Sequence, residues 1–271
     1  MALLGAGCSR PAPPPQPPAP AAPTASPATP AAAPVVSQWL LPSRFRGQII
    51  STRVRYFPRK LLALTFDDGP DPKVTPQVLA TLAQYHAHAT FFTLGGVAAG
   101  HEDLLRRIVA GGHAVGSHSY SHIATATPAQ AASNLDRTEQ LILKVTGHRP
   151  TLFRPPYGIT KGELARQARQ RGYAVILWTI SSADTRPIGP EVIAHNVIHT
   201  PNPGDIVLMH DGSGHSRTAQ ALPQILRELG QAGFEFVTIP ELMDAWDQWL
   251  RSQPAVAPPR APKPAGGAPH G

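Results

Sequence analysis

Short, mainly apolar runs alternate with amphipathic segments through the middle of the chain. The runs have strand length, and the one at residues 61–64 is apolar enough to be buried on both faces of a sheet. Predicted strands cover residues 61–64, 89–94, 113–116, 151–153, 173–180, 206–209 and 234–239. Apolar positions spaced three and four apart predict helices between these strands. The helices fall near residues 78–86, 104–109, 128–146, 160–172, 190–198 and 222–229, and a last helix carries Trp246.

The alternation of strands and helices predicts a parallel sheet with right-handed crossovers, either open or closed into a barrel. Polar clusters favour the barrel, because each of them falls just after a predicted strand. The clusters are Asp67/Asp68, His118/His122, Arg154/Tyr157, Ser182/Asp184 and His210. A (β/α) barrel builds its active face from the carboxyl ends of several strands. We therefore expect an α/β fold, a distorted (β/α) barrel with fewer than eight regular strands, in a single domain.

Two capping boxes predict where helices begin. Thr127 with Gln130 forms the first, and Pro128 occupies the first helical position behind Thr127. Thr160 with Glu163 forms the second. Each box predicts side-chain hydrogen bonds that close the first turn of its helix.

Proline is concentrated at the two ends of the chain. Of 32 prolines, eleven lie in residues 11–34 and six in residues 254–269. These Pro/Ala-rich segments bury too little apolar surface to offset the entropy of ordering, so we expect disordered, semi-extended spacers. The expected organisation is a signal-like start and linker over 1–47, one folded domain over 48–250 and a disordered tail over 251–271.

The net charge of +7 is partly explained by a basic stretch ahead of the first core strand. Its members are Arg44, Arg46, Arg53, Arg55, Arg59 and Lys60. Two interpretations are open: a patch for an anionic surface, such as lipid headgroups or an acidic cell-wall polymer, and a solvated entry segment. No nucleic-acid-binding motif accompanies the charge, so nucleic acid is not an expected partner.

The single cysteine, Cys8, excludes an intrachain disulfide. Residues 3–9 resemble the end of a bacterial lipoprotein signal, where small residues precede a lipid-modified cysteine. The charged start and the full apolar core of such a signal are missing. A start codon assigned too far downstream would explain both gaps, so membrane anchoring through a lipidated Cys8 is one of the alternatives.

Two adjacent carboxylates, Asp67 and Asp68, follow the strand at 61–64, and Gly69 and Pro70 end it. Neighbouring side chains on a strand point to opposite faces, so both carboxylates reach one pocket only if the chain bends there. Different surroundings would then separate their pKa values, leaving one ionised on a metal while the other takes a proton. A charged, flexible turn is the alternative interpretation.

His118 and His122 are four residues apart, a spacing that on a helical turn lets both imidazoles share one metal. No Glu follows the first histidine, unlike the zinc-protease helix motif. Asp68 is the available third ligand. Two imidazoles and one carboxylate leave positions open for water and substrate, and this set suits zinc or a similar divalent ion.

Four motifs together resemble the polysaccharide deacetylases of carbohydrate esterase family four, the NodB-homology domain. They are Thr65–Pro70, His118-Ser-Tyr-Ser-His122, Arg154-Pro-Pro-Tyr157-Gly158 and Leu208-Met209-His210. Their order and spacing match across residues 48–250. The resemblance implies a distorted (β/α) barrel that removes acetyl groups from acetylated sugars with the help of one divalent metal. Zinc is the expected ion, with cobalt and nickel as alternatives.

The resemblance also implies a role for each matching residue. Asp67 matches the general base, Arg154 its orienting partner, and His210 the general acid. Asp68, His118 and His122 match the metal ligands. The Tyr157 backbone N–H matches an oxyanion donor, and Leu208 and Pro156 match substrate-binding positions, Leu208 as a wall of the acetate pocket.

One motif departs from the family pattern. After the strand at 173–180 the family shows an Asp-Trp pair, whereas this chain has Asp184 followed by Thr185. Asp184 matches the carboxylate that tunes the acid histidine. The missing tryptophan affects the grip on substrate rather than the hydrolytic chemistry.

The expected protein is an exported, monomeric hydrolase that acts on N-acetylated sugars of an envelope polysaccharide, peptidoglycan or an exopolysaccharide. An O-acetyl esterase or small-amide hydrolase on the same fold is the first alternative. A non-catalytic glycan-binding barrel is the second, although a binder needs neither the base Asp67 nor the acid His210.

Overall fold

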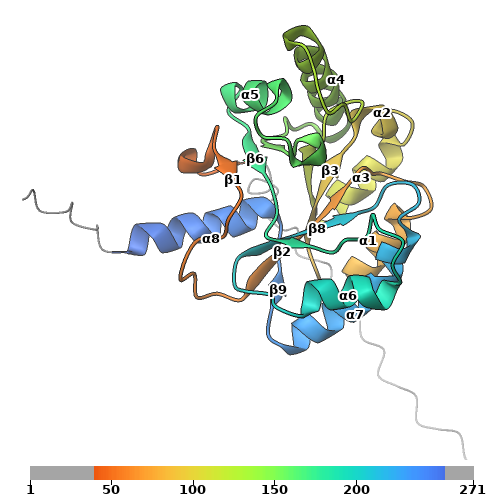
Figure 1. The fold of residues 1–271 in the computed structure, drawn as a ribbon, viewed down its shortest axis with the longest axis vertical. Coiled ribbons are helices and arrows are strands. Elements are labelled where there is room, and N and C mark those ends of the chain that lie inside the picture. Colours follow the sequence, from red (N-terminus) through yellow and green to blue (C-terminus); the bar gives the residue numbers. More distant parts are fainter. Residues whose placement is uncertain (1–39, 254–271) are drawn as a thin grey trace, which may run out of the picture. The chain divides into compact units, whose positions relative to one another are not determined.

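A computed structural model describes residues 40–253 of the chain (Figure 1). The expectations for Cys8, for the Pro/Ala-rich linker and for residues 254–271 fall outside the described residues. Within residues 40–253, none of the helices is both long and apolar enough to cross a membrane.

The described part of the chain contains one sheet in which every strand pair is parallel. The strands are β1 Ile49–Ile50, β2 Leu61–Asp67, β3 Ala89–Thr93, β4 Ala114–Ser117, β5 Leu152–Phe153, β6 Ala174–Ile176, β7 Ile180–Ser181, β8 Asp205–His210 and β9 Glu235–Phe236. Their order is β1-β6-β5-β4-β3-β2-β8-β7, and β9 pairs with the start of β2. Four of these strands have only two residues. The expected distorted barrel with fewer than eight regular strands is confirmed, as an open half-barrel.

Strand β2 lies at the centre of the sheet, and all seven of its residues are buried. Its alternate side chains serve two cores. Leu62, Leu64 and Phe66 join the larger apolar cluster, whereas Leu61 and Ala63 join the cluster that contains Trp246. Because side chains alternate along a strand, Asp67 lies on the face of Leu61 and Ala63. The strand thus directs its last carboxylate toward the inside of the half-barrel.

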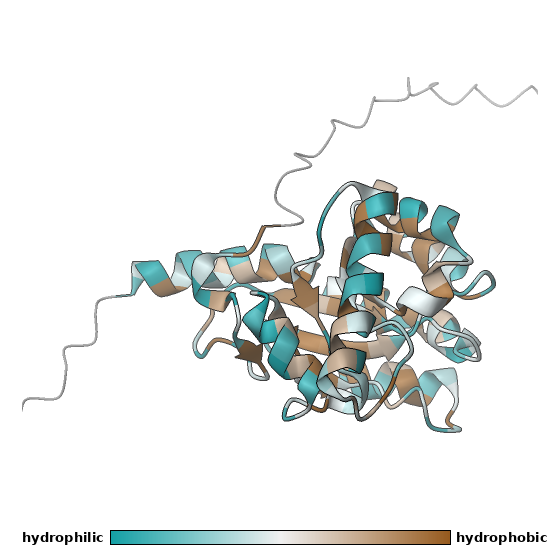
Figure 2. Cartoon of the chain, turned by 90° about the horizontal axis from the view of Figure 1, so that it is seen from above, coloured by the Kyte–Doolittle hydropathy of each residue, from teal (hydrophilic) through white to brown (hydrophobic). Residues whose placement is uncertain are grey.

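The helices pack their apolar faces on this sheet, and Figure 2 shows mainly hydrophobic strands beneath helices with both hydrophilic and hydrophobic sides. The helices are α1 Thr75–Gln84, α2 Gly95–Ala98, α3 Glu102–Ala110, α4 Pro128–Thr146, α5 Glu163–Gln170, α6 Pro190–Ile198, α7 Ser216–Gln231 and α8 Ile239–Ser252. Short 3₁₀ turns occur at Ser43–Phe45 and Pro156–Gly158. Helix α8 carries the buried Trp246 into the smaller cluster, which closes the inner face of the half-barrel.

The strand predicted over 173–180 is instead two strands with a break between them. Strand β6 pairs with β1 and β5, whereas β7 pairs with β8 at the other end of the sheet. The connecting chain therefore crosses the open seam of the half-barrel. Two carbonyls near the break, those of Ile176 and Leu177, accept hydrogen bonds from the Arg154 guanidinium at 3.1 and 3.2 Å. A buried arginine therefore supports the backbone at the break.

One of the two predicted capping boxes is present. Thr127 caps α4, with its hydroxyl accepting from the Gln130 N–H and the Gln130 side chain accepting from the Thr127 N–H. The box predicted at Thr160 is wrong, because α5 begins at Glu163 behind Gly162. The Glu163 carboxylate instead bonds forward to Arg166 and Gln167 in the first turn of its own helix.

Candidate active site

The carboxyl ends of β2, β4, β5 and β8 meet around one cavity of about 460 Å³. The lining residues are Asp67, Asp68, His118, His122, Pro155, Tyr157, Gly158, Trp178, Ser181, Thr185, Leu208 and His210. The clusters predicted after separate strands therefore come together, because parallel strands present their carboxyl ends at the same edge of the sheet.

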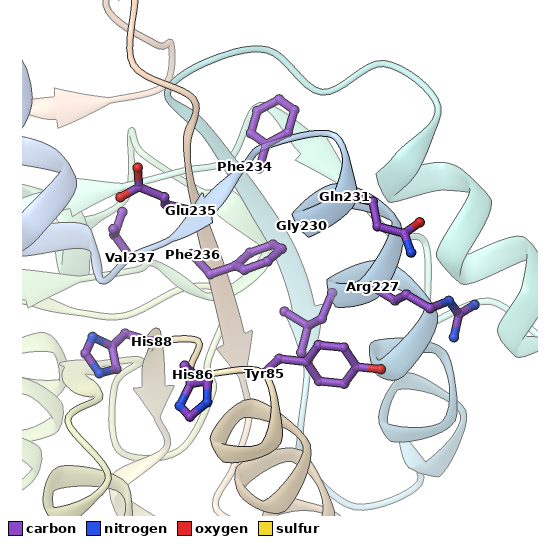
Figure 3. Close-up of a pocket in the computed structure, with 11 residues that line it drawn as sticks. Tyr85, His86, His88, Arg227, Gly230, Gln231, Phe234, Glu235, Phe236 and Val237 are labelled. Carbon is purple, nitrogen blue, oxygen red and sulfur yellow. The ribbon is translucent and has the colours of Figure 1, made fainter. Parts of the chain in front are cut away.

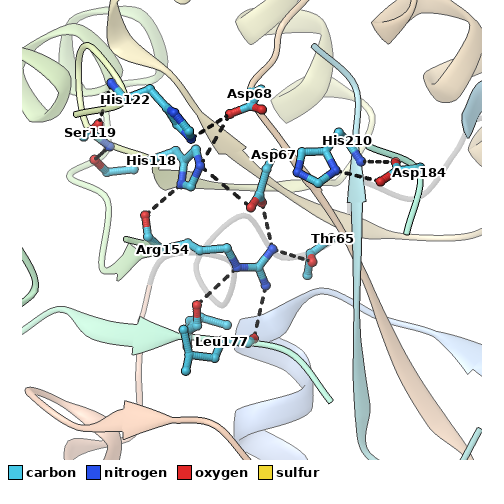
Figure 4. A network of polar contacts seen from close by, with 12 residues as sticks. Thr65, Asp67, Asp68, His118, Ser119, His122, Arg154, Leu177, Asp184 and His210 are labelled. Carbon is cyan, nitrogen blue, oxygen red and sulfur yellow. Dashed lines mark hydrogen bonds and ion pairs between the residues drawn. The ribbon is translucent and has the colours of Figure 1, made fainter. Parts of the chain in front are cut away.

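Asp67 and Arg154 form a buried ion pair beneath this cavity. The Arg154 guanidinium donates to Asp67 Oδ1 at 2.7 Å and to the Thr65 hydroxyl at 2.7 Å (Figure 4). Arg154 is 0% exposed and Asp67 is 2% exposed. Burial lowers the pKa of the Arg154 guanidinium, and the neighbouring Asp67 charge opposes that shift. Three hydrogen bonds, to the Thr65 hydroxyl and to the Ile176 and Leu177 carbonyls, fix the guanidinium. Its fourth hydrogen bond therefore holds the Asp67 carboxylate in one orientation.

The bend expected after Asp67 is present. Asp68 has φ 72°, in the left-handed region, and this turn lets both carboxylates line the same cavity. The backbone of Gly212 comes so close that a Cβ there would lie 2.7 Å from the Asp68 Cβ. Glycine at position 212 thus leaves room for the turn that aims Asp68 into the cavity.

His118 and His122 face each other in a loop, so the expected helical turn is wrong. His118 follows β4, and both Ser119 (φ 71°) and His122 (φ 53°) have left-handed backbones. The ring centroids are 5.0 Å apart. Three groups of the loop, the N–H groups of Tyr120 and Ser121 and the Ser121 hydroxyl, donate to one oxygen of Asn134 on α4. Asn134 therefore fixes the loop, a long-range contact that no local pattern reveals.

The donor atoms of Asp68, His118 and His122 fit a divalent metal. Asp68 Oδ1 lies 3.4 Å from His118 Nε2 and 3.5 Å from His122 Nε2, and it is buried without a hydrogen-bond partner among residues 40–253. The Nδ1 atom of His118 is 2.8 Å from the Arg154 carbonyl, so Nδ1 carries the proton and Nε2 keeps its lone pair. Burial also lowers the pKa of His118, which favours the neutral ring that a metal requires.

His210 stands on the other side of the cavity, held by a buried carboxylate. Its Nδ1 lies 2.8 Å from Asp184 Oδ1, and Asp184 Oδ2 accepts from the His210 N–H at 2.8 Å and from the Thr218 hydroxyl at 2.7 Å. Burial alone would lower the pKa of His210, but the hydrogen bond and charge of Asp184 outweigh it and raise that pKa. For Asp184, burial is similarly outweighed by His210, and its pKa is lowered. The pair therefore favours an imidazolium beside a carboxylate.

His215 was not expected at the site. Its ring stacks on His210 with centroids 4.9 Å apart and an angle of 21° between the planes. Asp184, His210 and His215 also lie close enough to suggest a second metal group. The oxygens of Asp184 already serve three hydrogen-bonding groups, and stacked rings do not converge on one ion. We therefore regard Asp184 and His210 as a hydrogen-bonded pair on which the His215 ring stacks.

Asp211 is a second unexpected carboxyl, fully buried behind the turn after Asp68. Its Oδ2 accepts from the Thr75 hydroxyl at 2.6 Å, and burial raises its pKa to about 7. The carboxyl lies against Gly69, where a Cβ would be 2.3 Å from Asp211 Oδ1. Gly69 is therefore needed for this close packing, which supports the turn that carries Asp68.

The residues on the substrate side agree only partly with the expectations. Leu208, Tyr157 and Thr185 line the cavity, and Tyr157 has a left-handed backbone with φ 57°. Pro156 is buried and is absent from the lining, where its neighbour Pro155 takes the place. Trp178 also lines the cavity, so an indole is present even though position 185 has none.

A separate cavity of about 690 Å³ lies at the amino ends of the strands (Figure 3). It is bounded by the end of α1, the end of α7 and β9, with Tyr85, Phe234 and Phe236 among its lining residues. It contains none of the predicted site residues. If cavity volume alone were used to locate the active site, this larger cavity would place it at the wrong end of the sheet.

Comparisons with known proteins agree with this geometry. A family model described as polysaccharide deacetylase matches residues 55–176. The chain is 37% identical over 188 residues to a peptidoglycan-N-acetylglucosamine deacetylase of Bacillus cereus, covering 68% of this chain and 88% of the relative. It is 35% identical over 192 residues to the peptidoglycan-N-acetylmuramic acid deacetylase PdaC of Bacillus subtilis, covering 70% and 40% of the two chains.

A solved structure shares the fold as well. The crystal structure of the Bc1960 peptidoglycan N-acetylglucosamine deacetylase, in complex with a naphthalenyl N-oxidanyl-benzamide, matches with a TM-score of 0.68 at 30% identity. The match covers 73% of this chain and 94% of that chain. By sequence and by fold, the chain belongs to the polysaccharide deacetylase family, carbohydrate esterase family four.

Proposed function

We propose that this deacetylase is a metal-dependent hydrolase that removes acetyl groups from N-acetylated sugars of an envelope polysaccharide, with peptidoglycan as the first candidate. One observation carries the proposal. The oriented carboxylate Asp67, the unpartnered Asp68 Oδ1 beside two imidazoles, and the carboxylate-held His210 surround one cavity. Amide hydrolysis needs a base, stabilisation of an oxyanion and an acid, and this cavity offers a residue for each.

Asp68, His118 and His122 are the residues that would hold the metal. The donor set of one carboxylate and two imidazoles suits zinc, with cobalt and nickel as alternatives. When bound, such an ion supplies Lewis acidity toward a water and a carbonyl oxygen.

Asp67 is the proposed general base, which takes a proton from the attacking water. It is suited to this because Arg154 fixes the orientation of the carboxylate and leaves Oδ2 directed away from the guanidinium, 3.9 Å from His118 Nε2. Arg154 acts through Asp67 as a positioning residue.

Tyr157 and Leu208 are proposed to bind the acetyl group. In a left-handed turn at the cavity wall, the Tyr157 backbone N–H is the proposed donor to the developing oxyanion. Leu208, only 8% exposed, offers an apolar wall for the acetyl methyl group. Pro156 is proposed to act only through the shape of the turn, because it does not line the cavity.

His210 is the proposed general acid, which gives a proton to the departing sugar nitrogen. The raised pKa of His210 keeps the ring protonated to higher pH than a free histidine. A proton on the nitrogen is required because an amine anion is a very poor leaving group.

The substrate proposal rests on what the relatives are named for, N-acetylglucosamine and N-acetylmuramic acid units of peptidoglycan. The test is acetate release from three substrates: purified peptidoglycan, N-acetylated chitooligosaccharides and an O-acetylated xylan. We expect acetate with loss of N-acetyl groups from the first two. Release from O-acetylated xylan alone would favour the esterase alternative. Binding of all three without release would favour the non-catalytic barrel.

Replacing Asp184 with Asn should shift the alkaline limb of the pH profile of kcat/KM to lower pH. Asp184 raises the pKa of His210, so without its charge the ring loses its proton at lower pH. Activity on amide substrates should fall by about tenfold to a hundredfold, since their leaving group needs the proton. Aryl acetates need little protonation and should lose much less.

A matched control is Thr218→Val, which removes one hydrogen bond to Asp184 but leaves the carboxylate charge. We expect it to move the alkaline limb less than Asp184→Asn. An unchanged limb in Asp184→Asn, or equal losses on both substrate types, would show that Asp184 does not serve His210.

We also propose that residues 48–250 form the catalytic domain and that the protein acts outside the cytoplasm at the cell envelope, as a monomer. The relatives named for peptidoglycan deacetylation support an envelope location. Residues 11–34 would then space the domain from an anchor, with a lipidated Cys8 as the candidate. Cell fractionation should recover the native protein with the envelope, and recovery of full-length protein from the cytosol would oppose the proposal.

A further inference from the structure

The basic stretch ahead of β2 is not a uniform patch, because several of its members have structural partners. The Arg44 side chain bonds Asp247, Arg53 lies 3.3 Å from Asp205, and the Lys60 amino group donates to the Ala232 carbonyl. Arg55 has no acidic partner among residues 40–253. Its guanidinium instead lies 5.3 Å from the centroid of the exposed Tyr56 ring. The cation at position 55 is therefore available to a ligand.

The loop that carries Arg55 is anchored on both sides of it. Phe57 is buried in the smaller core cluster, and Val54 packs against the same cluster. Tyr56, between these anchors, has φ 58° and is 82% exposed. A left-handed backbone at an aromatic residue is strained. Here the strained residue places its ring in solvent, where the ring adds nothing to the packing of the hydrophobic core. Arginine and exposed aromatic rings are typical of binding surfaces.

Arg55 and Tyr56 also lie in the wall of a cavity next to the active site. This cavity of about 610 Å³ is lined by five residues of the loop, Ser51, Thr52, Arg53, Arg55 and Tyr56, and by Trp178 and Thr179. Trp178 lines the active-site cavity too. The two cavities therefore share one indole at the seam where the half-barrel is open.

We propose that this second cavity is a subsite for a carboxylate-bearing sugar unit next to the acetylated sugar, with Arg55 as the charge that recognises the carboxylate. The proposal rests on the proposed function, and it adds a preference for acidic glycans. The rings of Tyr56 and Trp178 offer flat apolar faces to the C–H side of a sugar ring. Arg53 also lines the cavity, but Asp205 at 3.3 Å offsets its charge, which leaves Arg55 as the unpaired cation of this wall. A lactyl or peptide carboxylate and a uronic acid share this chemistry.

A glycan fits these observations better than a membrane. The free cation lies beside an indole that also lines the reaction site, so a polymer with one sugar in that site would pass Trp178 toward Arg55. Lipid headgroups require a broad array of free lysine and arginine residues. Here three of the six basic residues already have partners in the fold.

Arg55→Gln tests the subsite, because it removes the charge and keeps most of the length of the side chain. We expect KM for a peptidoglycan glycan fragment with free carboxyls to rise about two- to fivefold, the range for one exposed ion pair, with kcat unchanged. KM for a neutral N-acetylated chitooligosaccharide and for the same fragment with amidated carboxyls should not change. The same comparison with an N-acetylated oligosaccharide that contains uronic acid distinguishes a uronic acid from a lactyl or peptide carboxylate as the group that Arg55 recognises.

The matched control is Arg59→Gln, which removes the same charge from the same loop. Arg59 lines a different cavity, with Trp249, and is not among the residues that line the cavity of Arg55. This variant should leave the preference for acidic over neutral substrates unchanged. Tyr56→Ala should weaken binding of acidic and neutral chains alike, because stacking on a sugar ring does not depend on charge.

Calorimetry of the binding of the acidic fragment tests the subsite independently of acetate release. Binding that weakens in Arg55→Gln, without turnover in the wild type, would support the subsite and refute the proposed hydrolysis. Equal affinity of wild type and Arg55→Gln for acidic glycans would overturn the subsite, whether or not acetate is released. Loss of binding to phosphatidylglycerol vesicles in Arg55→Gln, with an unchanged preference between glycans, would assign the charge to a membrane and also overturn it.

Discussion

Asp67→Asn is expected to bind metal as the wild type does and to lose acetate release by about 10²–10⁴-fold, the range for removal of a general base. The amide is nearly isosteric with the carboxylate but accepts no proton from water at neutral pH. Metal should remain because the proposed ligands are Asp68, His118 and His122. The measurement is kcat/KM for acetate release, together with metal content per chain by elemental analysis.

The fold of this variant must be checked, since Asp67 is the counter-charge of a fully buried arginine. Breaking a buried ion pair by removing one partner costs about 3–5 kcal/mol. Arg154 keeps three other acceptors, Thr65 and the carbonyls of Ile176 and Leu177, so we expect a lower melting temperature but a folded protein at 25 °C. Asp68→Asn is the contrasting variant, and it should lose metal and activity together. More than about a tenth of wild-type turnover in Asp67→Asn would contradict its role as the base.

His118→Ala and His122→Ala are each expected to abolish stoichiometric metal binding and, with it, acetate release. Each variant removes one of the two Nε2 atoms that face Asp68 Oδ1. The remaining two ligands cannot hold the ion in a fixed geometry. Elemental analysis of dialysed protein should find about one divalent ion per wild-type chain and little in either variant.

The chain supplies a control for the spacing of the two histidines. His195 and His199 are also four residues apart, at the end of α6, and their rings stack with centroids 4.9 Å apart. They belong to no metal-ligating group found among residues 40–253. His195→Ala should therefore keep the full metal content. Equal metal in the wild type and in both His118→Ala and His122→Ala would refute the three-ligand site.

The sequence predicted the features that depend on local pattern and on the general behaviour of parallel strands. Strand β2 and its terminal carboxylates were predicted from an apolar run followed by polar residues and a break. Residues as distant as Asp67 and His210 could be expected at one site because strands of one parallel sheet share a carboxyl edge. The register that places Asp67 beside His210 on β8 confirms that expectation.

Other features depend on contacts that no local pattern contains. The break between β6 and β7 occurs where the chain crosses the open seam. There the Arg154 guanidinium donates hydrogen bonds to the carbonyls of Ile176 and Leu177. The loop from His118 to His122 keeps a non-helical shape through Asn134, and the capping box at Thr160 fails although its sequence is suitable. Trp178 was missed as a wall of the site for the same reason, since its position is set by the seam.

The most direct test of the account is acetate release by protein that has been stripped of metal with a chelator and then titrated with zinc. The substrate is an N-acetylated chitooligosaccharide, and released acetate is measured at each step. We predict that stripping abolishes release and that about one equivalent of zinc per chain restores it. Undiminished release by the stripped protein, or no release from any acetylated glycan by protein that holds one zinc ion, would contradict a metal-dependent deacetylase.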